Sequence, residues 1–288
     1  MVNVARKNGK RRMKTETCGE GTPSLPGKQD GVWHRFSIRN DNVEPKLRAV
    51  AWIDIMGGKN FMWRSMSSCA IFIGKLYAAV EYAVSKQSPN PVRVFRMSDG
   101  VYVCGDEFSY VRDVVDFTMH QCACDFLNTS DNHHRFLLRA AIAYGSTIIG
   151  EDLKAQNPDC SFLDSMIIGA PVAWANEAER KAPPLGVFLH ESCRSFAAGR
   201  TGIGWVLNRW WLSSKLSCGK PFAKKVGKRV NGYLEWEKRN KIETGIPDGK
   251  VEEYHEAVEE YFELPRKKDN VESMKEIVKV NNNVKETK

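Results

Sequence analysis

Val50-Ala51-Trp52-Ile53-Asp54-Ile55-Met56-Gly57-Gly58 is an apolar run that carries one carboxylate and ends in two glycines. The run is too apolar to face water on either side, which predicts a central strand that begins near Leu47. A carboxylate at the end of a buried strand is costly unless a cation or another partner compensates its charge. The paired glycines predict a turn whose backbone comes close to another group.

A second apolar run, residues 92–103, carries Asp99 in a Ser98-Asp99-Gly100 bend, and this pattern predicts a hairpin. If the two strands lie side by side, Asp54 and Asp99 form a site for Mg²⁺ or Mn²⁺ that can hold a nucleoside triphosphate. The alternative is that Asp54 only ends a strand and Asp99 only makes a turn. Asp106 competes for the second role, but its position before an apolar helix suits a helix cap, so we favour Asp99.

The remaining apolar periodicity predicts an α+β fold. Helices are expected over 65–85, 107–127 and 169–181, and strands over 136–144 (continuing to 148–149) and 185–190. The order β-α-ββ-α-β-α-β between residues 47 and 190 predicts one mixed sheet with helices packed on it. Residues 151–161 read as a loop. Two charged amphipathic helices are expected over 232–242 and 251–263.

Length and composition predict one catalytic domain, residues 46–192, between a flexible basic arm (1–45) and a basic, helical C-terminal elaboration with a polar tail (193–288). The chain has 288 residues, 42% of them apolar, and a formal charge of +8. It has no uninterrupted apolar run of membrane-spanning length and a charged start, so we expect a cytoplasmic protein with no membrane span. The eight cysteines include no CxxC pair and are expected to be structural thiols.

Four motifs, in order, resemble those of the class III nucleotidyl cyclases. Residues 51–58 resemble the first metal strand, and residues 96–100 resemble the second metal hairpin, where the family usually has Gly-Asp and this chain has Ser98-Asp99. Residues 138–145 with Gly150 resemble the next core strand, and residues 168–177 resemble the glycine-led helix after it. The resemblance implies a ferredoxin-like βαββαβ core.

The departures from that family change the expected substrate. Phe95 and Met166 stand where purine cyclases read the base, and Ala173 and Glu177 stand where they place an asparagine and an arginine for the transition state. The pattern is most similar to the pyrimidine (uridylate) cyclases of the bacterial Pycsar antiphage system. It implies conversion of UTP to cyclic UMP and pyrophosphate. Alternatives are a cytidylate cyclase that makes cyclic CMP, an inactive cyclase-fold regulator, and a basic nucleic-acid-binding protein.

The resemblance also implies roles for individual residues. Asp54, Asp99 and the carbonyl oxygen of Ile55 would hold two Mn²⁺ or Mg²⁺ ions, and Gly57 and Gly58 would bring amides to the triphosphate. A head-to-tail homodimer would form two sites at its interface, and the product would act through a cyclic-nucleotide-binding effector without direct contact.

Three further groups have more than one interpretation. Phe95 is a candidate packing surface for the base. Arg139, in an apolar strand, needs either a carboxylate or a substrate phosphate as its partner. The cluster Lys220, Lys224, Lys225, Lys228 and Arg229 is interpreted as a solvated helix face, with phosphate contact as the alternative, and no nucleic-acid partner is expected.

Overall fold

A computed structural model describes residues 43–58, 62–63, 65–87, 92–154, 161–196, 206–240 and 248–265. Contacts within the chain divide it into two units, Met1–Ile38 and Arg39–Lys288, and all described residues belong to the second. The predicted basic arm lies outside the described residues up to residue 42.

The core follows the predicted order of elements. It consists of β1 (Lys46–Ile55), α2 (Met66–Ser85), β2 (Val92–Met97), β3 (Gly100–Gly105), α3 (Phe108–Asn128) and β4 (Leu138–Ile149). The strands lie in the order β2-β3-β1-β4, and each neighbouring pair is antiparallel. This is the ferredoxin-like βαββαβ arrangement, so the α+β prediction is confirmed.

Three short strands extend the sheet to seven. They are β5 (Ile167–Gly169), antiparallel to β4, β6 (Gly186–Leu189), parallel to β4, and β7 (Leu207–Asn208), antiparallel to β6. The parallel β4–β6 pair makes the sheet mixed. Between β5 and β6 the chain crosses the sheet as α5 (Ala170–Glu179), whose start is marked by a glycine and a proline.

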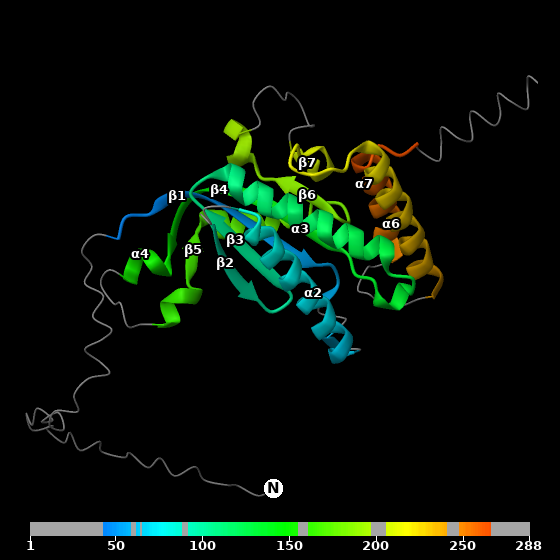
Figure 1. The fold of residues 1–288 in the computed structure, drawn as a ribbon, viewed down its shortest axis with the longest axis horizontal. Coiled ribbons are helices and arrows are strands. Elements are labelled where there is room, and N and C mark those ends of the chain that lie inside the picture. The colour runs from blue at the N-terminus through cyan, green and yellow to red at the C-terminus, as the bar shows by residue number, and fades with distance from the viewer. Residues whose placement is uncertain are drawn as a thin grey trace, which may run out of the picture. The chain divides into compact units, whose positions relative to one another are not determined.

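Helices α2 and α3 cover one face of the sheet (Figure 1), and α5 packs on β4 and β1 on the other face. Ala49, Ala51, Ile53 and Ile55 share one core cluster with residues of α2 and α3, which contact each other side by side. The alternate residues of β1, Val50 and Trp52, belong to a second cluster that includes Ala175 of α5. Because side chains alternate along a strand, Asp54 is on the face that α5 covers.

The C-terminal part packs on the first of these clusters. It contains α6 (Lys220–Asn240) and α7 (Asp248–Tyr261), which contact each other, and the buried residues Trp210 and Trp211. The prediction of a helix over 232–242 was wrong at its start, because the apolar residues 223, 226, 230 and 234 continue the helical period back through the basic cluster. Residues 150–154, expected as part of a strand end and loop, form the short helix α4 (Gly150–Lys154).

Four short 3-10 helices complete the described elements: Asn132–His134, Ser161–Ser165, Glu191–Phe196 and Trp210–Leu212. Among the described helices, α2 alone is long and apolar enough to cross a membrane by length and composition. Its residues Cys69, Phe72, Leu76, Ala79, Val80 and Ala83 are buried in the protein, and the core helix of a soluble protein passes the same test.

Candidate active site

Asp54 lies one residue before the end of β1. It is directly opposite Gly100 of β3 on one side and Arg139 of β4 on the other. The strand ends because Met56 and Gly57 form a turn, and Gly57 has a φ of 75°, which lies in the left-handed region that favours glycine. The sequence thus places a carboxylate in the middle of a sheet, immediately before a sharp reversal.

Asp99 lies in the two-residue turn between β2 and β3. Ser98, the other turn residue, has a φ of 42°, and its carbonyl oxygen accepts a hydrogen bond of 3.1 Å from the Tyr77 hydroxyl. A left-handed conformation is unfavourable for a residue with a β-carbon. Ser98 therefore occupies a backbone position suited to glycine, which is the residue that the Gly-Asp pattern has at this point.

The turn after β1 and the β2–β3 turn meet. The Ile55 amide donates to the Asp99 carbonyl oxygen at 3.2 Å. A β-carbon added to Gly58 would lie 2.3 Å from Asp99 Oδ2 and 2.9 Å from Asp99 Cβ, so only glycine leaves room for this carboxylate. The structure thus brings Asp54, Asp99, Ile55 and the paired glycines to one end of the sheet, as the sequence predicted.

The charge at this end of the sheet is not balanced within the protein. Burial, together with the neighbouring carboxylates of Glu179 and Asp99, raises the pKa of Asp54 to about 8, against the opposing effect of Arg139. Three carboxyl groups, those of Asp54, Asp99 and Glu179, thus lie near a single positively charged side chain, that of Arg139. A divalent cation would offset this excess, so the residues present fit a metal ion.

The protein supplies few atoms that could bind a metal ion. Among the residues that the structure describes, no group of three or more His, Cys, Asp or Glu side chains is placed to hold a metal ion. Two carboxylates and one carbonyl oxygen leave coordination positions for water and substrate phosphate, which is the usual way in which Mg²⁺ is bound. The donor set therefore suits an ion that arrives with a nucleotide better than a permanent structural metal.

Arg139 has a carboxylate partner inside the protein. Its Nε lies 2.6 Å from Glu179 Oε1, and both side chains are buried, with 14% and 5% of their surface exposed. Its Nη1 lies 3.4 Å from the Tyr254 hydroxyl of α7. Of the two partners that the sequence left open, the structure supplies the carboxylate, and phosphate contact by Arg139 stays a prediction.

Glu179 and Tyr254 were not recognised in the sequence. Glu179 lies on the buried side of α5 with Ala175 and Ala178, and this helical spacing was the available signal. Burial raises the pKa of Glu179, although the ion pair with Arg139 opposes the shift. No pattern in the sequence indicated that α7 reaches this site.

Phe95 is placed differently from the expectation that it packs on a base. Its ring is 4% exposed and belongs to the cluster with Val50, Trp52 and Tyr102. The rings of Trp52 and Tyr102 lie 4.3 Å apart at their centroids. Phe95 therefore supports the sheet face behind Asp54 and offers little free surface to a ligand in this conformation.

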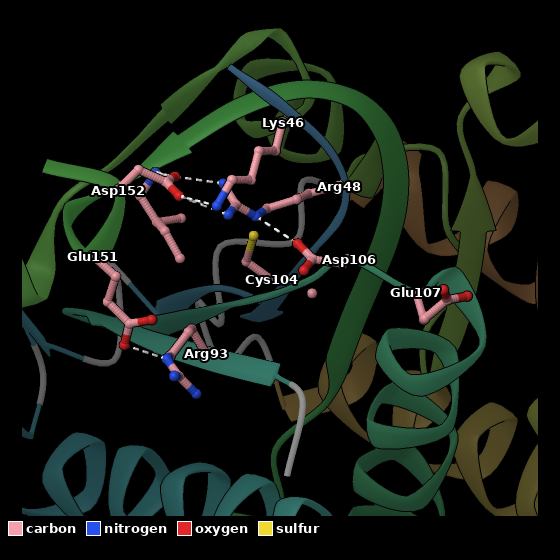
Figure 2. A pocket seen from close by; sticks show the side chains of 10 residues that line it. Lys46, Arg48, Arg93, Cys104, Asp106, Glu107, Glu151 and Asp152 are labelled. Atoms are coloured by element: carbon pink, nitrogen blue, oxygen red, sulfur yellow. Dashed lines mark hydrogen bonds and ion pairs between the residues drawn. The ribbon is translucent and has the colours of Figure 1, made fainter. Parts of the chain in front are cut away.

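A separate cavity of about 730 Å³ lies at the opposite end of β1, where it is lined by Lys46, Arg48, Asp106, Glu151 and Asp152, among others (Figure 2). Arg48 donates to both oxygens of Asp152 at 2.6 and 3.0 Å and to Asp106 at 2.8 Å. Arg48 lies six positions before Asp54 in β1, about 20 Å along a strand. Asp106 therefore cannot share an ion with Asp54.

The charges of this cavity are paired with one another. Lys46 lies 2.9 Å from Asp152, and Arg93 pairs with Glu151, as Figure 2 shows. Burial alone would raise the pKa of Asp152, but the hydrogen bonds from Arg48 hold that pKa well below its usual range. Such a network stabilises the end of the sheet, and we assign the cavity no ligand.

Comparisons with known proteins gave structural matches alone. No family model and no curated protein matches the chain. The guanylyl cyclase domain of the RhoGC fusion protein from the fungus Blastocladiella emersonii is 13% identical, with 55% of this chain and 89% of that chain covered and a TM-score of 0.41. An adenylate/guanylate cyclase/hydrolase from Silicibacter pomeroyi is 15% identical, with 55% and 84% covered and a TM-score of 0.42.

A third solved structure covers more of this chain. It is a class III adenylyl cyclase-like ATP-binding protein from Pseudomonas aeruginosa, 14% identical, with 70% of this chain and 47% of that chain covered and a TM-score of 0.41. At these identities and scores, function has to be inferred from the residues of this chain.

Proposed function

We propose that this chain is a nucleotidyl cyclase that converts a pyrimidine nucleoside triphosphate, UTP in preference to CTP, to the 3′,5′-cyclic monophosphate and pyrophosphate. The observation that carries the proposal is the close approach of Asp99 to Gly58, where its carboxylate and that of Glu179 act electrostatically on the half-buried Asp54 at the end of the sheet. Carboxylates held together at such a cost suit a divalent-cation site.

The chain's own groups have distinct tasks in the proposed reaction. Asp54, Asp99 and the Ile55 carbonyl oxygen would hold two Mg²⁺ or Mn²⁺ ions, which activate the ribose 3′-hydroxyl and offset charge on the α-phosphate. Gly57 and Gly58 leave main-chain amides open to the triphosphate. The ion pair of Arg139 with Glu179 fixes the strand beside Asp54 and keeps the sheet end rigid.

The preference for a pyrimidine rests on what the site lacks. The four positions at which purine cyclases read the base or stabilise the transition state hold Phe95, Met166, Ala173 and Glu177. Phe95 is buried, and Met166 has no side-chain group that reads the edge of a purine. A pyrimidine is smaller than a purine and needs fewer base-reading side chains.

Assembly and signalling form part of the same proposal. Ala173 and Trp174 lie exposed on α5, on the sheet face that carries Asp54. We propose that a second copy of the chain packs head to tail against this face, so that two equivalent sites form. The cyclic product would then act as an antiphage signal through a cyclic-nucleotide-binding effector.

The test is a product assay. Purified protein with Mn²⁺ is incubated separately with ATP, GTP, CTP and UTP, and the products are identified by mass spectrometry. We expect cyclic UMP, and we expect Asp54→Asn and Asp99→Asn to abolish it. Asp106→Asn is the matched control, because it removes an aspartate at the other end of the sheet. Equal turnover by all four proteins would refute the site.

A second candidate is a cyclase-fold regulator that binds nucleotide without turnover. The exposed carboxylate of Glu177, at the position of the family's transition-state arginine, favours it, because a negative charge near the triphosphate opposes catalysis. Saturable binding of a triphosphate, with no cyclic product from any of the four nucleotides and either metal, would support this candidate against the cyclase.

A further inference from the structure

Helix α6 carries a basic face whose side chains form no ion pair within 4 Å among the described residues. This basic face consists of Lys224, Lys225, Lys228 and Arg229, all exposed. No Asp or Glu occurs in the sequence between residues 206 and 234. The neighbouring cations Lys220 and Arg209 do have a partner, since both pair with Glu263, at 2.9 and 2.7 Å.

Two acidic residues of the adjacent helix α7 pair with lysines outside the basic face. Glu252 pairs with Lys238, near the end of α6, and Glu253 pairs with Lys250 of α7. Within the described part of the chain, no ion pair joins an acid of α7 to the basic face. Lys224 lies near the Glu263 carboxylate, which already pairs with Lys220 and Arg209, so the four charges of the basic face are not offset by ion pairs of their own.

A buried cation adds to the positive charge behind Arg229. Arg135 is 2% exposed, and its guanidinium donates to main-chain carbonyl oxygens, including that of Phe126 at 3.1 Å. Burial and the nearby charge of Arg229 lower the pKa of Arg135. Two arginines held close together favour the approach of a polyanion.

From this arrangement we infer that the basic face of α6 binds the phosphate backbone of nucleic acid, a function separate from the proposed cyclase site. Lys224 and Lys228, like Lys225 and Arg229, are four residues apart, which places successive charges about 6 Å apart along the helix. Three of the four cations are lysines, which act as point charges on phosphates. Binding is therefore expected to be independent of base sequence.

A membrane surface is a poorer partner for this helix. Interfacial helices insert an apolar face between lipid headgroups. The apolar face of α6, which includes Val226, Val230 and Leu234, is already buried in the protein. The partly buried Phe222 and Trp236 of α6 pack against the same core. The helix therefore has no free apolar face to insert into a bilayer, so the occupant that fits is a hydrated polyanion.

The experiment measures binding of the full chain to fluorescently labelled single-stranded DNA, duplex DNA and RNA over a series of salt concentrations. The test variant carries Lys224→Gln, Lys225→Gln and Lys228→Gln. Each phosphate contact adds about 0.7 to 0.9 to the slope of log K against log salt, so the variant should lose roughly 2 to 3 from that slope. At low salt its affinity should fall more than about tenfold.

Two controls separate the basic face from charge in general and from folding. A variant with Lys7→Gln, Lys10→Gln and Arg11→Gln removes the same charge from the N-terminal arm. A variant with the three α6 lysines replaced by arginine keeps the charge and should bind like the parent. An unchanged slope in the α6 glutamine variant, loss only in the arm variant, or no nucleic-acid binding by the parent would each overturn the inference.

Discussion

Replacing Asp54 with asparagine should stabilise the metal-free protein at the same time as it abolishes catalysis. The pKa of this carboxyl is 3.8 in a free chain and about 8 in the fold, because it is buried beside the carboxylates of Glu179 and Asp99. Between these pH values the folded state keeps a proton that the unfolded state releases. Stability therefore falls as pH rises through this window and levels off above it.

The magnitude follows from the shift. One pKa unit corresponds to about 1.4 kcal/mol, so the full shift sets an upper bound of about 6 kcal/mol at high pH. Asp54 is only partly buried, and solvent access reduces the effect to roughly 2–4 kcal/mol. Asparagine has nearly the same shape and no charge, so Asp54→Asn avoids this cost.

The assay is urea unfolding of both proteins in a chelator, repeated from pH 4 to pH 9. The variant should gain stability over the parent as pH rises to about 8. Glu81→Gln, which removes an exposed carboxylate of α2, is the control and should show no such divergence. Adding Mn²⁺ at a hundred times its Kd should stabilise the parent by about 2.7 kcal/mol and the variant by much less. Parallel pH profiles for parent and Asp54→Asn would refute the charge cluster.

Other substitutions test the same site. Gly58→Ala places a β-carbon 2.3 Å from Asp99 Oδ2 and so displaces this proposed metal ligand. The product assay should show at least a roughly tenfold loss of turnover, and the urea midpoint should change little. Glu179→Gln leaves the Arg139 guanidinium buried without a carboxylate and should cost about 3–5 kcal/mol in urea unfolding, and it should move the Asp54 titration to lower pH. Ser98→Gly relieves a φ of 42° and should raise stability by roughly 0.5–1 kcal/mol, measured by thermal unfolding, with activity kept.

The framework of the fold and half of the site could be predicted because both depend on local patterns. Strand and helix periods specify β1, α2, the β2–β3 hairpin and α3. The Asp99-Gly100 turn and the glycines after Asp54 specify where the chain reverses. Once β1 and β3 are neighbours, their register places Asp54 opposite Gly100 and close to Asp99.

The rest of the site depends on tertiary contacts that a linear pattern does not contain. An arginine in an apolar strand needs a negatively charged partner. The sequence does not show whether that partner is a substrate or Glu179, 40 positions further along the chain. Phe95 was expected to face a base because it stands where purine cyclases read the base, whereas it is buried in the cluster with Trp52 and Tyr102. Side-chain burial was the missing information in both cases.

The C-terminal part of the chain completes the structure around the site. The Tyr261 hydroxyl accepts a hydrogen bond from the Val187 amide at 3.2 Å and donates to Asn208 at 2.5 Å, which ties β6 and β7 to α7. Tyr254 of the same helix lies 3.4 Å from Arg139, the residue opposite Asp54. A chain cut after residue 192 would lose both contacts and expose the edge of β6, so α7 and the site beside Asp54 are coupled through the sheet. A ligand on the neighbouring helix α6 would therefore act on a part of the protein that contacts the site.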